Sequence, residues 1–210
     1  MVVDGDGSSM GLNSGLLKSE LLADTLSVAM STGGEFAEVF VEDRRSTSAV
    51  LDDGRIEELS SGRDRGAGIR VTLGETTGFA HTADLSPAGL RAAAEAASAA
   101  ARSGGGGVNV VTLDGPSGPP PAVVSVLPAD VPKARKVALL ERADAAARST
   151  DGAISQVSAR YGDSQRRIQI ANSEGLLTGD RQIRTLFSVS CVAAGAVSYT
   201  HLTLPTIYSV

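Results

Sequence analysis

The chain has 210 residues, of which 42% are hydrophobic, only 3% are aromatic and none is tryptophan. It is long enough to bury a core, and that core has to be built from aliphatic side chains and alanine. A net charge of −5 at pH 7 argues against a protein that binds nucleic acid or anionic membranes, because such binding relies on basic surfaces.

The first residues and the cysteine content predict a cytoplasmic protein. Residues 1–15 have neither the positive region nor the apolar stretch of a signal peptide, and we expect them to form a disordered tail. The sequence contains no run of about 18 apolar residues, so it predicts no membrane span. The single cysteine, Cys191, excludes an intrachain disulfide, in keeping with a reducing compartment.

Two helices are expected in the first half of the chain. Residues 16–30 repeat apolar side chains with the period of an amphipathic helix. The second helix is expected to follow Ser86, a good N-cap with a proline after it, and to end at Gly104. Its alanine-rich run, residues 92–101, predicts a thin helix that can lie close to a sheet.

Between these helices apolar and polar residues alternate, which is the period of β-strands. Residues 37–43 and 46–59 are expected to be strands, with a hairpin turn at positions 53–54. Residues 67–82 predict a further pair that turns at positions 74–75. Because short turns join antiparallel neighbours, we expect a meander.

The second half repeats this alternation of helix and strand. Residues 104–132 hold six of the eight prolines and are expected to cross the domain surface as an extended excursion. Residues 132–152 predict a third helix with Asp130 as its cap. The period of two then returns over residues 153–195, with further turns expected at positions 162–163, 174–175 and 179–180.

The two strand blocks are similar to each other. Gly54 aligns with Gly175 and Gly74 with Gly195 when one block is shifted by 121 residues. Either an ancestral duplication or turn signals shared by unrelated hairpins explains these few identities. In both cases the pattern predicts an α+β fold, an antiparallel sheet with helices packed on one side.

No complete active site is found among the residue patterns. His81 has no nucleophile motif beside it and is expected to be a structural or solvated residue. Cys191 stands in an apolar strand and is expected to be a buried, inert thiol. The glycine-rich residues 62–70 lack the spacing of a dinucleotide or phosphate loop and are expected to curve a strand. We therefore predict no catalytic, cofactor-binding or metal-ligating residue in this chain.

The order of these motifs resembles the TldD/PmbA family, also described as modulators of DNA gyrase. Residues 37–102, in which DDGRIEEL, GAGIRV and TGFAHT precede a capped helix, are similar to the amino-terminal domain of that family. Residues 130–149 and 167–193 resemble the second half of the same domain. The stretch TGDRQIRTLFSVSCVA is closer to the TldD branch than to the PmbA branch, and the whole resemblance covers residues 16–194.

This resemblance implies part of a cytoplasmic zinc metallopeptidase that cleaves unfolded or extended peptides and pairs a TldD-type with a PmbA-type subunit. In the family, a His-Glu-x-x-x-His helix and a later cysteine hold zinc in the carboxy-terminal domain, where the metal activates water. None of these positions matches a residue of this chain, so zinc is expected only in a longer protein. The alternatives are a non-catalytic PmbA-like partner subunit and an unrelated α+β peptide-binding module.

The last residues differ in character from the rest of the chain. Residues 197–206 match the translation of a transposon-type sequencing adapter, and the family resemblance stops at the same point. We therefore expect His201 and Tyr208 to belong to an artefact that follows a truncated gene. A genuine terminal strand is the alternative, because valine, tyrosine and isoleucine favour strands. The expected organisation is a tail over 1–15, one domain over 16–196 and the artefact over 197–210.

Overall fold

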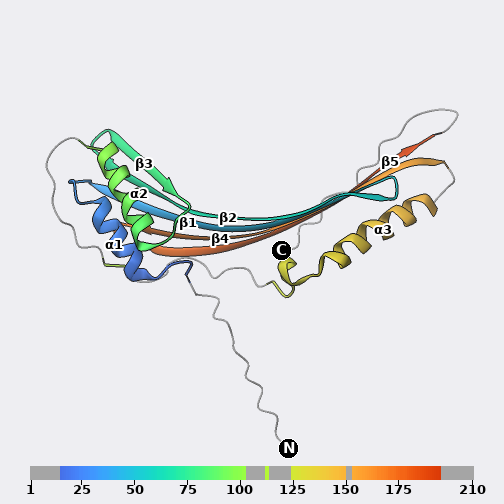
Figure 1. Cartoon of the computed structure of the whole chain (residues 1–210), viewed down its shortest axis with the longest axis horizontal. Coiled ribbons are helices and arrows are strands. Elements are labelled where there is room, and N and C mark those ends of the chain that lie inside the picture. Colours follow the sequence, from blue (N-terminus) through green and yellow to red (C-terminus); the bar gives the residue numbers. More distant parts are fainter. Residues whose placement is uncertain (1–14, 103–111, 114–123, 150–152, 195–210) are drawn as a thin grey trace, which may run out of the picture. The chain divides into compact units, whose positions relative to one another are not determined.

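The computed structural model describes residues 15–102, 112–113, 124–149 and 153–194. Figure 1 shows the elements in chain order from the amino-terminal helix to the last strand. They are α1 (Ser19–Ala29), β1 (Phe36–Asp52), β2 (Arg55–Leu73), β3 (Thr76–Thr82), α2 (Pro87–Ala100), the short 3-10 helix η1 (Pro128–Asp130), α3 (Lys133–Ser149), β4 (Ile154–Asn172) and β5 (Leu177–Ala193). Among the described helices, none is long and apolar enough to cross a membrane.

The strands form one five-stranded sheet in the order β3-β2-β1-β4-β5. β2 and β3 are antiparallel, with Ala67 opposite Thr82 and Leu73 opposite Thr76. β1–β2 and β4–β5 are the two long hairpins, and strands of 17 or 19 residues build them. The predicted α+β fold with an antiparallel sheet is confirmed.

The chain divides into two compact units. Unit 1 contains residues 1–42, 65–121 and 168–180, and unit 2 contains residues 43–64, 122–167 and 181–210. The four long strands contribute residues to both units, because each strand passes from one set of ranges into the other. Each unit has its own apolar cluster.

Unit 1 is built on helices α1 and α2. α1 packs against α2, and α2 packs against β3, as Figure 1 shows. The apolar face of α1 and alternate residues of β1 and β2 are fully buried, as the amphipathic and period-two patterns predict. The largest of these side chains are Leu22, Leu26, Val39, Val41, Ile69 and Val71, and Leu90 of α2 joins the same cluster.

Unit 2 is built on helix α3 and on parts of β1, β2, β4 and β5. Its apolar cluster is smaller than that of unit 1 and comprises Ala49, Leu51, Leu140, Val157, Ala159, Tyr161 and Val189. Five of these seven residues lie at odd-numbered positions of β1 and β4, which is the pattern of a strand with one buried face. α3 contributes only Leu140 among them.

Three local expectations differ from the structure. β1 runs without a break through Arg44 and Arg45, because pairing with β2 and β4 on either side overrides the local polar run. Asp130 lies in the 3-10 helix η1 instead of capping α3, which begins at Lys133. β4 and β5 run without a break through positions 162–163 and 179–180, where the sequence predicts turns. The expectations for the tail, for the segment 195–210 and for most of the excursion over 104–132 fall outside the described residues and stay predictions.

The two long hairpins have equivalent contacts as well as equivalent turn residues. Gly54 and Gly175 both have positive φ, +79° and +90°. The N–H of Ala37 donates to the Ser173 hydroxyl (3.0 Å), and the Ser158 hydroxyl donates to the Asp52 carboxylate (2.8 Å). A shift of 121 residues places Ala37 on Ser158 and Asp52 on Ser173. The two contacts therefore join equivalent positions of the two hairpins. This equivalence favours the duplication over chance similarity of turns.

Candidate functional site

His81 and Cys191, the two residues considered for metal or nucleophile chemistry, lie in surroundings typical of structural residues. His81 is exposed on β3, and its ring stacks on that of Phe79 with the centroids 6.3 Å apart. Phe79 itself is 61% exposed. Cys191 is partly buried on β5, where it packs against the apolar cluster of unit 2. The glycine-rich residues 62–70 form a continuous part of β2 and make no loop.

The described residues do not fit a zinc ion. A protein zinc site needs three or four histidine, cysteine or carboxylate ligands around one point. In the part of the chain that the structure describes, no three such side chains are grouped to hold a metal ion. His81 faces solvent beside an aromatic ring, and Cys191 packs among aliphatic groups. No reaction step is therefore assigned to these residues.

A bidentate ion pair joins β1 to β2 in unit 2. Arg63 donates from Nε to one Asp43 oxygen (2.8 Å) and from Nη2 to the other (2.5 Å). The hydrogen bond from Arg63 holds the pKa of Asp43 below its ordinary value, although burial of the carboxylate opposes this shift. Because the planar guanidinium matches the carboxylate, this pair fixes the register of the two strands.

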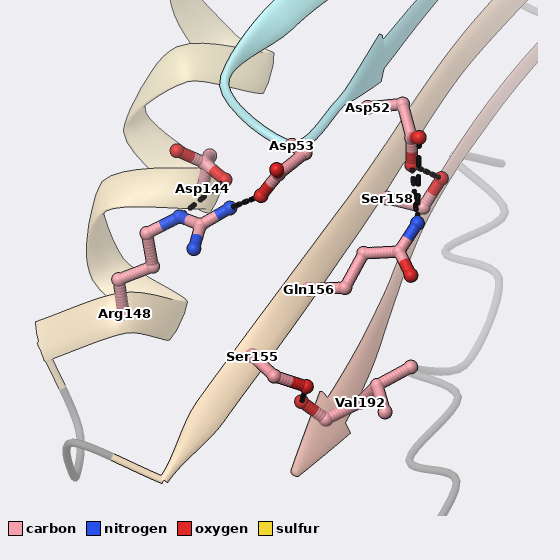
Figure 2. A network of polar contacts seen from close by, with 8 residues as sticks. All are labelled: Asp52, Asp53, Asp144, Arg148, Ser155, Gln156, Ser158 and Val192. Carbon is pink, nitrogen blue, oxygen red and sulfur yellow. Dashed lines mark hydrogen bonds and ion pairs between the residues drawn. The ribbon is translucent and has the colours of Figure 1, made fainter. Parts of the chain in front are cut away.

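The tip of the β1–β2 hairpin is tied to helix α3. Asp53 and Gly54 both have positive φ, +46° and +79°, as a tight turn of this hand requires. Figure 2 shows Arg148 of α3 between two carboxylates: its Nη2 donates to Asp53 (2.5 Å) and its Nε to Asp144 (3.1 Å). The hydrogen bond to Asp53 raises the pKa of the Arg148 guanidinium, which stays charged.

A second part of the network in Figure 2 links Asp52 to strand β4. The Asp52 carboxylate accepts from the Ser158 hydroxyl at 2.8 Å and from the Gln156 amide at 3.3 Å and 3.4 Å. Nearby, the Ser155 hydroxyl donates to the Val192 carbonyl on β5 at 3.1 Å. These bonds cross-link the strands where a hairpin end would otherwise fray.

The most deeply buried charges of unit 2 lie between α3 and β4. Lys136 Nζ is 2.5 Å from an Asp163 carboxylate oxygen, and both side chains are almost fully buried. The same ammonium group lies 5.5 Å from the centre of the Tyr161 ring. Burial, and then the hydrogen bond with Asp163, raise the pKa of the Tyr161 hydroxyl well above its ordinary value, so it remains a donor.

Sequence analysis did not single out this cluster, although the signals were present. Lys136 is four residues before Leu140 and so shares its helix face. Asp163 continues the odd-numbered positions of β4 that bury Val157 and Tyr161. A lysine and an aspartate at positions expected to be apolar could have indicated a buried pair.

The polar groups just described bind one another and so organise the structure of unit 2. The carboxylates of Asp43, Asp52 and Asp163 each accept hydrogen bonds from the protein itself. In the networks just described the donors are arginine, lysine, serine, glutamine and tyrosine side chains. These bonds hold the strands and helix α3 of unit 2 in register, which is a positioning role.

The chain matches two family models. Residues 37–101 match the first domain of the PmbA/TldA metallopeptidases, and residues 127–205 match the central domain of the same metallopeptidases. The first match spans β1 to α2, and the second begins just before η1 and α3. The second match also extends into the segment from residue 195 on, which lies outside the described residues.

Curated relatives agree with these models. The chain is 29% identical over 175 residues to a metalloprotease TldD homolog of Haemophilus influenzae, which covers 83% of this chain and 36% of that protein. It is 32% identical over 165 residues to a metalloprotease of Methanothermobacter thermautotrophicus, which covers 76% of this chain and 34% of that protein. The chain thus spans about a third of the length of the curated relatives it matches.

Solved structures share the fold. A protein of Thermotoga maritima described as a modulator of DNA gyrase superposes with a TM-score of 0.70 at 16% identity, over 88% of this chain and 41% of that one. TldE from Thermococcus kodakarensis also gives 0.70 at 16% identity, over 87% and 42% of the two chains. With two family models matched in the family's domain order, the chain belongs to the PmbA/TldD metallopeptidase family and carries its first domain and sequence of its central domain.

Proposed function

We propose that this chain is the amino-terminal, non-catalytic part of a TldD-like zinc metallopeptidase that cleaves unfolded or extended peptides. In that enzyme this part of the chain would shape the substrate chamber and contribute to the subunit contact. Hydrolysis belongs to the carboxy-terminal part of the longer protein, where zinc and its activated water would supply the chemistry.

The observation that carries this proposal is that charged side chains of unit 2 form ion pairs with one another. Within unit 2, Arg63 of β2 pairs with Asp43 of β1, and Lys136 of α3 pairs with Asp163 of β4. Charged groups that are closed in such pairs serve to hold the scaffold together. The match to a first and a central domain supports a position upstream of the catalytic part.

The TldD branch is favoured over the PmbA branch by the curated relatives. Two of them, from Haemophilus influenzae and Buchnera aphidicola, are named TldD homologs, and the chain is 29% and 28% identical to them. We therefore propose a PmbA-type subunit as partner, zinc as the cofactor of the longer protein, and the cytoplasm as its compartment. Similarity to TldE at 16% identity reflects the common fold.

The experiment compares the chain with the longer protein that we propose. Genomic DNA is amplified and sequenced across codon 196, and any longer product is purified beside the chain itself. We expect a downstream frame that encodes His-Glu-x-x-x-His, and zinc-dependent cleavage of an extended peptide by the longer product alone. A downstream frame without that motif would favour the PmbA-like subunit. Zinc-dependent turnover by the chain itself would contradict the proposal.

A further inference from the structure

Helix α3 is attached to its sheet differently from the other two helices. α1 buries four of its 11 residues and α2 buries five of its 14, and all of these except Thr25 and Ser98 are apolar. α3 is the longest helix, with 17 residues, yet only Lys136 and Leu140 are buried. Burial of apolar surface is the main contribution that holds a helix on a sheet. Because α3 buries so little apolar surface, this contribution is small for α3.

One of the two buried residues of α3 is charged. Lys136 and Asp163 have side-chain exposures of 3% and 5%, so both ions have lost their water. Such a pair is stable only while both partners are present and well placed, because a single buried ion is strongly unfavourable. The Tyr161 hydroxyl completes the arrangement through its hydrogen bond with Asp163.

The other end of α3 is held by a more exposed contact. Arg148 and Asp53 have side-chain exposures of 34% and 64%, and ion pairs so accessible to water contribute little. Arg148 also pairs with Asp144 within α3 itself, which adds nothing to docking. The helix therefore rests on Leu140, on partly buried alanines and on the Lys136–Asp163 pair.

We propose that α3 detaches from the unit 2 sheet as a unit, with the Lys136–Asp163 pair as the latch that keeps it docked. Detachment uncovers the apolar cluster beneath the helix, including the side of β5 that carries Cys191. Loss of either charge leaves its partner buried alone and shifts the equilibrium toward the detached state. This conformational device is independent of the peptidase assignment.

The chain offers its own reporter for this motion. Cys191 is its only cysteine and packs against the cluster that α3 covers, so the rate of thiol labelling follows the opening of that surface. Hydrogen exchange of the α3 amides gives a second measure. The amides of α1 and α2, which lie in unit 1, serve as the internal control for global unfolding.

Three variants test the latch on the purified chain. In Asp163→Asn and in Lys136→Met, α3 exchange and Cys191 labelling are expected to rise at least about tenfold, while α1 and α2 stay protected. The double variant Lys136→Met with Asp163→Leu removes both charges together and is expected to return both rates toward those of the natural chain. Arg91→Met, which breaks an exposed pair on α2 with Glu95, is the matched control and should change neither rate.

Several results would overturn the proposal. Unchanged α3 exchange in both single variants would show that the pair does not hold the helix. Loss of protection in α1, α2 and α3 together would show that α3 has no independent opening. A double variant whose α3 exchange and Cys191 labelling are as fast as those of the single variants would show that packing volume, and not charge, keeps α3 in place.

Discussion

Gly78 of β3 lies against Ala101 at the end of α2 so closely that a Cβ on Gly78 would be 2.5 Å from the Ala101 backbone nitrogen. The carbonyl oxygen of Ala97 would be closer still. Only a glycine facing an alanine-rich helix surface permits this approach, because any larger pair of side chains would push the two backbones apart. The contact explains why α2 is rich in alanine where it meets the sheet.

Replacement of Gly78 by alanine is therefore expected to destabilise unit 1. The new methyl group meets backbone atoms, which cannot rotate away, so we expect a loss of about 2 kcal/mol or more in the free energy of unfolding. Chemical denaturation measures the change. Gly162→Ala on β4 is the control: nothing lies within 4 Å of its Cβ position, and its stability should stay within about 0.5 kcal/mol of the natural chain.

The Asp43–Arg63 pair predicts a dependence of stability on acid. The hydrogen bond from Arg63 lowers the folded-state pKa of Asp43 below its ordinary value of 3.8. The pair therefore contributes its full stabilisation above about pH 3.8, and this contribution is lost as the pH falls from there toward the lowered pKa. Denaturation curves of the natural chain and of Asp43→Asn should thus differ at pH 6 and converge in strong acid.

A conservative change distinguishes geometry from charge in this pair. Arg63→Lys keeps the positive charge and loses the planar fork that bonds both carboxylate oxygens. Its stability at pH 6 should fall between those of the natural chain and Asp43→Asn. Equality with the natural chain would show that the bidentate geometry contributes nothing.

The amino-terminal cap of α2 gives a third prediction. The Ser86 hydroxyl accepts a hydrogen bond from the N–H of Gly89 at 3.2 Å, and Pro87 occupies the first helical turn. Ser86→Ala leaves that N–H without its partner and should cost about 1 kcal/mol in unfolding free energy. Ser86→Thr keeps a hydroxyl at the same place and should lose clearly less, which thermal unfolding can resolve.

The turn glycines of the two long hairpins give a fourth prediction. Gly54 and Gly175 hold φ values of +79° and +90°, which are costly for residues with a Cβ. Gly54→Ala and Gly175→Ala should each destabilise the chain by about 1 kcal/mol. Gly54→Asn should be better tolerated than Gly54→Ala, because asparagine enters the left-handed region more readily. Equal losses at Gly54 and Gly175 are expected if the two hairpins are equivalent copies.

Much of the fold could be predicted from local patterns. The cap at Ser86 and the turns at positions 53–54 and 74–75 lie where turn and cap chemistry places them, because these signals act over a few neighbouring residues. Alternation of apolar residues in β1 and β4 indicated the buried face of each strand. The α+β class followed from these local elements and short connections.

Other features escaped local reasoning. The continuity of β1 through Arg44 and Arg45 depends on backbone pairing to strands on either side, one of them more than 100 residues away in the sequence. The Lys136–Asp163 pair joins residues 27 positions apart whose burial shows only when α3 and β4 are docked. Because a charged residue in an amphipathic helix normally lies in water, the spacing of Lys136 from Leu140 could not by itself show that Lys136 is buried.

By itself, the sequence determined the helices, the hairpin turns, the aliphatic core and a family resemblance that the domain matches confirm. Only the tertiary structure decided how the strands are divided between two units, which charges are buried together and how unequally the three helices are held. The physical reason is range: caps, turns and periodicity are set by neighbours along the chain, whereas burial and ion pairing depend on groups that folding brings together.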